Sequence, residues 1–147
     1  MIATLGMLVG FTANIGLLRQ VVEGGATRAE LPASEQLPVP VMLDEVQELL
    51  ADGALPVDAR LPEQYAEGYL PNARNLPLSE LEMFLDAFKG GVETNRVLIV
   101  YCNGYGCPDS FDLAQVLIRE GYRDVRVFEG GFPEWQDAGL PVAGVTQ

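Results

Sequence analysis

One stretch of the sequence, "RVLIVYCNGYGCPDSFDLAQVLIREGY" from Arg96 to Tyr122, limits the possible folds more than any other. Its opening segment, "RVLIVY", is almost continuously apolar and rich in β-branched side chains, which is typical of a strand buried on both faces of a parallel sheet. After Cys102 and a short loop, apolar residues recur at helical spacing up to Gly121. Since parallel strands are joined by crossover connections, usually helices, the stretch indicates an α/β domain.

The same alternation of strands and helices extends over the rest of the chain from residue 41 onward. "ALPVDAR" and "DVRVFEGG" are predicted strands. Apolar spacing, together with Gly or Pro near the ends, predicts further helices in "LDEVQELLADG", "LPEQYAEG", "LSELEMFLDAF" and "PEWQDAG". Ser79 is the predicted N-cap of the third of these. The predicted fold is a mostly parallel central sheet with helices on both faces.

The chain is predicted to have three parts: a hydrophobic segment over residues 1–20, a linker over 21–40 and the α/β domain over 41–147. The linker assignment depends on a high content of Gly, Pro, Ser and Glu without a sustained period. The domain is long enough to bury one hydrophobic core.

The N-terminal segment is predicted to be a membrane anchor. No charged side chain occurs from Met1 to Leu18, and residues 2–18 are just long enough to cross a slightly thinned bilayer as one helix. A cleaved signal peptide and a soluble amphipathic helix are the alternatives, although the basic region of a signal peptide is not visible. Arg19 and Arg28 follow the segment, so a single-pass protein with its domain on the cytoplasmic side is expected.

The composition excludes several classes of function. With 9 Lys and Arg against 21 Asp and Glu, the formal net charge is -12, which disfavours binding to nucleic acid. The sequence has no His, so a Ser-His-Asp or Cys-His catalytic arrangement is excluded. A metal-ligand cluster and a phosphate-binding glycine motif are also missing from the sequence, so no metal and no cofactor are expected.

The loop after the predicted buried strand is suited to holding a negative charge. Ligands of open α/β sheets bind beyond the carboxyl ends of the strands, where Cys102 lies. Gly104 and Gly106 allow backbone N–H groups to turn inward, and a helix beginning near Asp109 or Ser110 would add the positive end of its dipole. Such a loop stabilises a thiolate or a persulfide without His. The alternative is that Cys102 is a small buried apolar residue.

Three motifs, in the right order, resemble the rhodanese-like domain of the single-domain sulfurtransferase type. "VDARLPEQYAEGYLPNARNLP" resembles the family's early motif, which contains Asp-x-Arg, and "EGGFPEWQDAGLPV" resembles its late Gly-Gly-x-x-x-Trp motif. Between them, "VYCNGYGCPDS" occupies the place of the family's active-site loop. The resemblance runs from Val41 to Val142.

The resemblance implies a sulfurtransferase that works by double displacement. Cys102 would take a sulfane sulfur from polysulfide, a persulfide or thiosulfate, carry it as a persulfide, and pass it to a thiol or protein acceptor. The implied substrate-binding residues are those of the loop and the helix start: Asn103, Gly104, Tyr105, Gly106, Cys107 and Ser110. Asp58 and Arg60 match the Asp-x-Arg motif, and they either organise the floor of the site or form a purely structural salt bridge.

The loop departs from the family pattern in two ways that bear on the donor. It is longer than is usual in a rhodanese, and it contains no basic residue. Because the protein is strongly acidic, it would repel an anionic donor such as thiosulfate. Little thiosulfate:cyanide turnover is therefore expected. The longer loop leaves room for a bulkier donor or for a protein surface.

Cys107, in the same loop as Cys102, has two interpretations. As a resolving thiol, it would attack the Cys102 persulfide, release sulfide and leave a disulfide. Alternatively, it is a passive loop residue. The separation of the Cα atoms and the directions of the Cβ atoms decide whether a bridge can form, and the sequence contains neither.

Two classes of function therefore remain: a sulfurtransferase that uses Cys102, and a non-catalytic rhodanese-like module that binds a partner or senses oxidation at the membrane. The missing basic residue favours the module, whereas the cysteine with its glycine-rich loop favours the enzyme. Related phosphatases and arsenate reductases hold an oxyanion with a loop arginine, and its absence here argues against both.

Overall fold

The central sheet is parallel throughout. The structure, a computed structural model, describes residues 36–144. Its strands are β1 (Val39–Val41), β2 (Leu55–Asp58), β3 (Arg74–Asn75), β4 (Leu98–Tyr101) and β5 (Val125–Phe128). They lie in the order β1-β5-β4-β2-β3, and every neighbouring pair is parallel.

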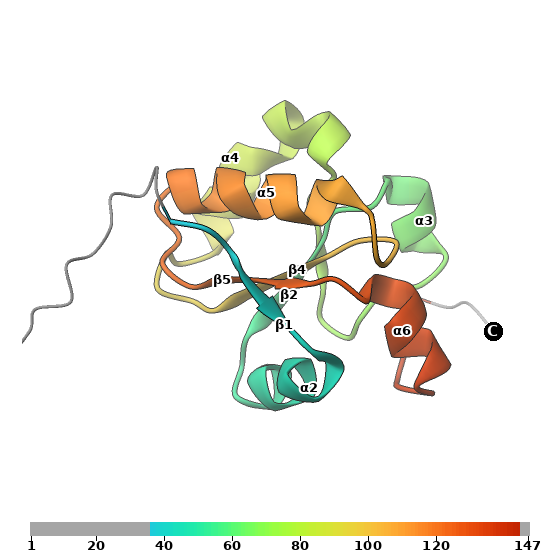
Figure 1. The fold of residues 1–147 in the computed structure, drawn as a ribbon. Coiled ribbons are helices and arrows are strands. Elements are labelled where there is room, and N and C mark those ends of the chain that lie inside the picture. The colour runs from blue at the N-terminus through green and yellow to red at the C-terminus, as the bar shows by residue number, and fades with distance from the viewer. Residues whose placement is uncertain (1–35, 145–147) are drawn as a thin grey trace, which may run out of the picture. The chain divides into compact units, whose positions relative to one another are not determined.

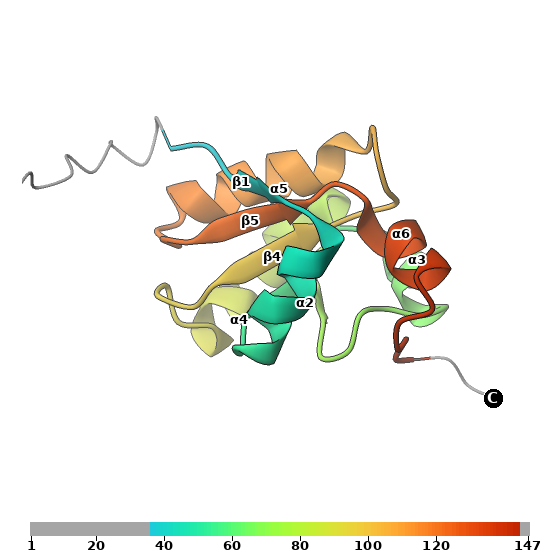
Figure 2. The same cartoon turned by 60° about the horizontal axis from the view of Figure 1, so that its bottom comes forward.

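Helices cover both faces of the sheet, which confirms the predicted fold class. They are α2 (Leu43–Ala51), α3 (Pro62–Ala66), the 3₁₀ helix η2 (Leu78–Glu80), α4 (Leu81–Gly91), α5 (Pro108–Arg119) and α6 (Gly131–Asp137). In Figure 1, α4 and α5 lie above the sheet, whereas α2 and α6 lie below it. The turned view in Figure 2 shows α2 in front of the sheet and α5 behind β5.

The side chains of β4 separate two hydrophobic cores. Leu98 and Val100 pack in the core that includes residues of α4 and α5, whereas Ile99 and Tyr101 pack in the core that includes residues of α2 and α6. All four are fully buried. Because successive side chains of a strand point to opposite faces, an uninterrupted apolar run fits a strand that is covered on both sides.

The register of the sheet brings the ends of β2, β4 and β5 to one edge. Asp58 pairs with Tyr101, and Tyr101 pairs with Phe128. The segments that follow these three residues therefore leave the sheet side by side. Cys102 follows the central one of the three strands.

The helix predicted over residues 78–88 begins differently in the structure. Leu78–Glu80 form η2, and α4 then begins at Leu81 with Glu80 as its N-cap and without a side-chain cap hydrogen bond. The predicted Ser79 cap is therefore wrong. Apolar spacing does not distinguish a tighter 3₁₀ turn from the first turn of an α-helix.

Replacing Ser79 by alanine is expected to change the free energy of unfolding by less than about 0.5 kcal/mol, because exposed substitutions away from caps have small effects. Removing a true N-cap serine would cost about 1 kcal/mol. Chemical denaturation of the wild-type chain and of the Ser79→Ala variant measures the difference. A loss as large as that of a true cap would show that the hydroxyl caps the helix in solution.

The predicted anchor and residues 21–35 of the predicted linker lie outside the described residues. Val39 and Pro40, the last two residues of the predicted linker, belong to β1. Between residues 36 and 144, no helix combines the length and the apolar character that crossing a bilayer requires.

Candidate active site

Cys102 lies directly after β4, at the edge of the sheet where β2 and β5 also end. Its carbonyl oxygen accepts a hydrogen bond of 3.0 Å from the backbone N–H of Phe132 in α6. A Cβ atom on Gly131 would lie 2.6 Å from the backbone nitrogen of Gly104, and closer still to the carbonyl oxygen of Cys102. The start of α6 therefore packs so closely against the loop backbone that only glycine fits.

The loop turns back on itself between Cys102 and α5. Gly104 and Gly106 have φ values of 106° and 84°, a region that favours glycine. The backbone N–H of Cys107 donates to the carbonyl oxygen of Gly104 over 3.1 Å and closes a turn. Cys107 is also the N-cap of α5. The turn thus returns Cys107 to the strand end that carries Cys102.

The two cysteines form a disulfide in this structure. Their Cα atoms are 6.3 Å apart, within the usual range for such a bond. Cys102 is buried, with 2% of its surface exposed, whereas Cys107 is partly exposed. The loop geometry therefore permits the bridge, the point that the sequence left open, and Cys107 is the more accessible member of the pair.

Two of the predicted substrate-binding side chains contact the neighbouring helices. Asn103 and Gln64 of α3 exchange hydrogen bonds between their amide groups. The hydroxyl of Tyr105 donates to a carboxylate oxygen of Glu134 in α6 over 3.2 Å. These contacts connect the rim of the loop to α3 and α6.

The loop backbone, by contrast, has N–H groups that donate to no other described residue. No N–H group of residues 103–106 has a hydrogen-bond acceptor among the described residues. Ser110 is buried, and its hydroxyl donates to the carbonyl oxygen of Cys107 over 3.5 Å. Unpaired backbone donors beside a cysteine are the groups that can stabilise a thiolate or a persulfide anion.

A cavity of about 300 Å³ opens beside the loop. It is lined by residues of the loop, of α5 and of the end of β5: Gly104, Tyr105, Gly106, Cys107, Pro108, Ser110, Phe111, Val127 and Glu129. Cys107 belongs to this lining, whereas Cys102 does not. Among the described residues that line the cavity, Glu129 carries the only charge, so the cavity does not attract anions.

A carboxylate lies near both sulfur atoms. One Asp109 carboxylate oxygen and the Sγ atoms of Cys102 and Cys107 all lie within 4.8 Å of one another. These atoms would suit a thiophilic metal ion only if both sulfurs were thiolates, and in a disulfide they are not. No basic residue occurs between Cys102 and Ile118 to offset the charge of Asp109.

Asp58, the last residue of β2, and Arg60, two residues later, form a buried ion pair. Their side chains are 0% and 4% exposed, and the Arg60 guanidinium donates to both carboxylate oxygens of Asp58. The guanidinium also donates to the carbonyl oxygen of Gly68 and lies 4.1 Å from the centre of the Phe132 ring. Among the described residues, none of its hydrogen bonds goes to residues 102–107. These contacts fit the interpretation of the pair as a structural salt bridge.

Two tyrosines near this ion pair remain protonated at neutral pH. Burial, and next the charge of Asp58, raise the pKa of Tyr101 far above its ordinary value. Burial raises the pKa of Tyr65 to about 12, and the charge of Tyr69, stacked on it, is the next cause. Both phenols are therefore protonated and cannot act as general bases, whereas the backbone donors of the loop and the N-terminus of α5 can favour a thiolate at Cys102.

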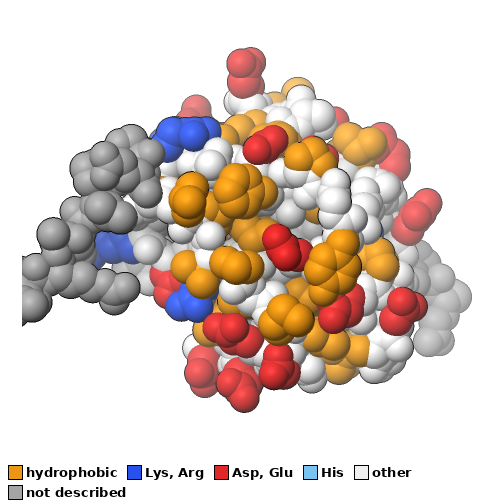
Figure 3. All heavy atoms as spheres, viewed as in Figure 1, with side chains coloured by type: hydrophobic (Ala, Val, Ile, Leu, Met, Phe, Trp, Pro, Cys, Tyr) orange, Lys and Arg blue, Asp and Glu red, His pale blue; other side chains and the backbone are white. Residues whose placement is uncertain are grey.

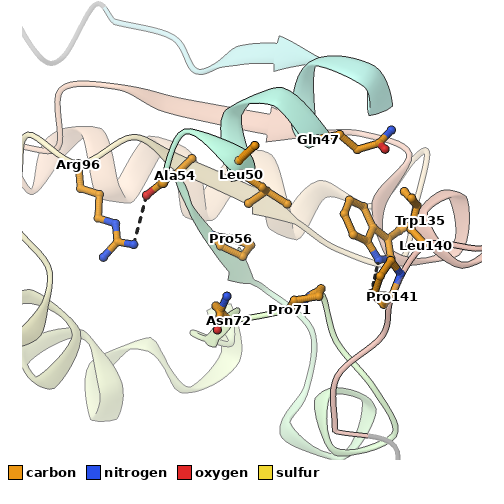
Figure 4. Close-up of a pocket in the computed structure, with 12 residues that line it drawn as sticks. Gln47, Leu50, Ala54, Pro56, Pro71, Asn72, Arg96, Trp135, Leu140 and Pro141 are labelled. Atoms are coloured by element: carbon orange, nitrogen blue, oxygen red, sulfur yellow. Dashed lines mark hydrogen bonds between the residues drawn. The ribbon is translucent and has the colours of Figure 1, made fainter.

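A larger, mostly apolar pocket of about 490 Å³ lies beside α2 and the start of β2. Figure 4 shows Arg96 at one end of it and Trp135 and Leu140 at the other. None of the predicted site residues lines it, and its described lining has no thiol, hydroxyl or carboxylate. Although large apolar pockets are the usual place to look for a ligand, the reactive groups of this chain gather at the Cys102 loop.

The sequence does not predict the part that α6 plays in the site. Gly131 and Phe132 hold the backbone of Cys102, and Glu134 accepts from Tyr105. The paired glycines before the helix are the available signal, because glycine often marks a close approach of two backbones. Nothing in the sequence indicates which backbone approaches.

Curated proteins similar to this chain include several with sulfurtransferase names. The thiosulfate sulfurtransferase GlpE of Pseudomonas aeruginosa is 29% identical over 93 residues, which are 63% of this chain and 79% of that protein. The thiosulfate sulfurtransferase YnjE of Escherichia coli is 28% identical over 149 residues, covering 88% of this chain and 34% of that protein. The HTH-type transcriptional regulator Rv0324 of Mycobacterium tuberculosis is 36% identical over 86 residues, covering 58% and 36%. The chain thus spans about a third of the length of the last two.

Solved structures show the same fold. The human single-domain sulfurtransferase TSTD1 is 31% identical with a TM-score of 0.58, and the match covers 69% of this chain and 97% of that one. The Alr3790 protein of Anabaena sp. has a TM-score of 0.62 at 22% identity, covering 73% and 94%. The family model for the rhodanese-like domain matches residues 42–138, a stretch that includes the parallel sheet from β2 to β5, the Cys102 loop and α6. From these matches and the geometry of the site, we conclude that the chain belongs to the rhodanese-like domain family.

Proposed function

We propose that this chain is a sulfurtransferase in which Cys102 carries a sulfane sulfur as a persulfide. The Cys102 thiolate attacks the outer sulfur of the donor, the sulfur–sulfur bond of the donor breaks, and the rest of the donor leaves as a thiolate or, when the donor is thiosulfate, as sulfite. A thiol or protein acceptor then takes the sulfur. One observation carries the proposal: Cys102 ends the central strand beside a loop whose N–H groups, over residues 103–106, have no acceptor among the described residues.

The charges around the loop favour an organic persulfide or a protein-bound persulfide over thiosulfate. Glu129 lines the cavity beside the loop, and Asp109 lies near both sulfurs. Asp and Glu side chains are also spread over the face of the molecule seen in Figure 3, where Lys and Arg are few. Thiosulfate carries two negative charges on a compact ion, so Coulomb repulsion penalises it more than a donor with less charge at its reacting end.

The reduced form of the loop is the one that can react. In the disulfide form, Cys102 has no thiolate and is almost completely covered. A reductant must open the bond before a donor can be attacked. Oxidation of the pair therefore stops sulfur transfer.

The second candidate function is a non-catalytic rhodanese-like module that binds a partner or senses oxidation. The disulfide favours it, because two cysteines that pair reversibly are the usual basis of a thiol sensor. In both cases the proposal includes attachment to a membrane through residues 2–18 as a single-pass anchor, with the domain on the cytoplasmic side.

Persulfide formation on Cys102 distinguishes the two functions. The Cys107→Ser variant of the full chain is the suitable background, because it cannot close the internal disulfide and erase a bound sulfur. After reduction and anaerobic removal of the reductant, it is mixed with glutathione persulfide or with thiosulfate, and its intact mass is measured. We expect a gain of one sulfur atom from glutathione persulfide, less from thiosulfate, and complete reversal by dithiothreitol.

The matched control is the double variant Cys102→Ala/Cys107→Ser, which should gain no sulfur. Alkylation of Cys102 by iodoacetamide shows independently that the thiol is free and reachable. If Cys102 is alkylated but no donor leaves sulfur on it, the enzyme is rejected and the module becomes the better description.

A further inference from the structure

We infer that Cys107 resolves the Cys102 persulfide, so that the chain releases the sulfane sulfur as sulfide and consumes a dithiol reductant. The inference deepens the proposed function and rests on it, because it requires a persulfide on Cys102. It adds a second activity, the reduction of persulfides, to sulfur transfer. It also implies a partner, a dithiol reductant, that must return the two cysteines to thiols after each turnover.

The first step of the argument is reach. The structure has the Sγ atoms of the two cysteines joined, with Cα atoms 6.3 Å apart. The hydrogen bond from the N–H of Cys107 to the carbonyl oxygen of Gly104 and the positive φ angles of Gly104 and Gly106 produce the turn that allows it. The loop therefore accommodates the product of an attack by Cys107 on the sulfur of Cys102.

The second step is activation of the attacking thiol. Cys107 is the N-cap of α5, which runs over 12 residues. The free N–H groups and the dipole at the start of a helix favour a thiolate at this position. The start of α5 thus favours a thiolate at Cys107, whereas the Asp109 carboxylate within 4.8 Å of its Sγ opposes one.

The third step concerns the charge of the persulfide. A persulfide anion on Cys102 would lie close to the Asp109 carboxylate, and no basic residue follows until Arg119. Repulsion between the two anions favours a reaction that carries the extra charge away. Departure of hydrosulfide does so and leaves an uncharged disulfide.

The chemistry balances in three steps. First, the Cys102 thiolate takes the outer sulfur of an organic persulfide, and the donor leaves as a thiolate. Second, Cys107 loses its proton and attacks Sγ of Cys102 as a thiolate, the bond to the outer sulfur breaks, and this sulfur takes up the proton and leaves as hydrosulfide with the electron pair of the broken bond. The sulfane sulfur is thereby reduced to sulfide while the two thiols are oxidised to the disulfide. Third, a dithiol reduces this disulfide and becomes a disulfide itself.

The accessibility of the two sulfurs fixes where the reductant attacks. Cys107 lines the cavity beside the loop and is partly exposed, whereas Cys102 is buried. The incoming thiolate therefore forms its mixed disulfide with Cys107 and expels the Cys102 thiolate into the loop. The second thiol of the reductant then frees Cys107. Each cycle returns Cys102 in the form that attacks the next donor.

A single anaerobic turnover tests the inference. The full chain is reduced, freed of reductant and mixed with one equivalent of glutathione persulfide, and both sulfide and intact protein mass are measured. The wild-type chain should release about one equivalent of sulfide and lose the mass of two hydrogens, with the new Cys102–Cys107 linkage found in a peptide digest. The Cys107→Ser variant should retain the sulfur and release no sulfide above the Cys102→Ala background. Treatment of the oxidised wild-type chain with dithiothreitol, followed by its removal, should restore the two thiols, so that a second equivalent of glutathione persulfide again yields about one equivalent of sulfide.

The outcomes separate the two proposals. If the wild-type chain keeps the persulfide as stably as Cys107→Ser does, the resolving role is wrong while the sulfurtransferase proposal stands. If neither protein acquires sulfur, the proposed function itself fails. Cys107→Ala serves as a second variant, and thermal unfolding of both variants beside the reduced wild-type chain shows whether a lost release comes from misfolding.

Discussion

Substitution of Asp58 by asparagine is expected to lower the free energy of unfolding by about 3–5 kcal/mol, the cost of leaving a buried charge without its partner. The Asp58 side chain is 0% exposed and accepts from both the Nε and Nη2 atoms of Arg60. Asparagine keeps the shape but not the charge, so the Arg60 guanidinium would remain buried with two neutral acceptors, the amide oxygen at position 58 and the carbonyl oxygen of Gly68, and without a counter-charge. A loss of this size would unfold much of a domain of ordinary stability.

Denaturation by urea at neutral pH measures the effect, and Asp124→Asn is the matched control. Asp124 also pairs with an arginine, Arg126, but its side chain is 37% exposed. Its substitution should cost less than about 1 kcal/mol. The double variant Asp58→Leu/Arg60→Met should recover most of the lost stability, because an apolar pair needs no compensating charge. If Asp58→Asn costs no more than Asp124→Asn, the ion pair is not the buried structural link that its contacts indicate.

In the Gly131→Ala variant, the rate of persulfide formation on Cys102 is expected to fall about 100-fold, because a displacement of a reacting group by 1 Å can slow its reaction by that factor. The new Cβ would lie 2.6 Å from the backbone nitrogen of Gly104 and closer to the carbonyl oxygen of Cys102. Both contacts are with backbone, which cannot turn aside as a side chain can. The loop that carries Cys102, the candidate nucleophile, must therefore move.

Gly139→Ala is the control that separates this clash from simple backbone strain. Gly139 has a φ of 69°, close to the 61° of Gly131, but a Cβ there would meet nothing within 4 Å. Each variant pays a strain of about 1–2 kcal/mol for alanine at positive φ, so stability alone does not distinguish them. The rate at which the reduced variants gain sulfur distinguishes them. Each variant is combined with Cys107→Ser, and the rates are compared at equal folded fraction. Equal rates in both would show that the contact of α6 with the loop does not position Cys102.

Much of the architecture around the site follows from local patterns. The apolar run before Cys102, the helix spacing up to Gly121 and the Asp-x-Arg motif all predict elements that the structure contains. Each pattern reflects neighbours along the chain: alternating faces of a strand, or the period of a helix. The edge strands β1 and β3 are only three and two residues long, which is too short for such a pattern to develop. The 3₁₀ turn at Leu78–Glu80 was not predicted either, because three residues are too few to show a period.

The candidate nucleophile could also be inferred from the sequence, since a cysteine that ends a buried strand before a glycine-rich loop has a predictable position. Cys107 could be named as a possible partner, but whether the two cysteines meet could not be decided. Whether Cys107 meets Cys102 depends on the turn closed at Gly104, and whether the loop stays in place depends on Gly131 and Phe132, which come from another part of the chain. Periodicity and motif therefore suffice to predict the layers of the fold and the candidate reacting atom, because these patterns arise from residues that are neighbours along the chain. The geometry that controls its chemistry arises from contacts between distant segments, and these exist only once the chain has folded.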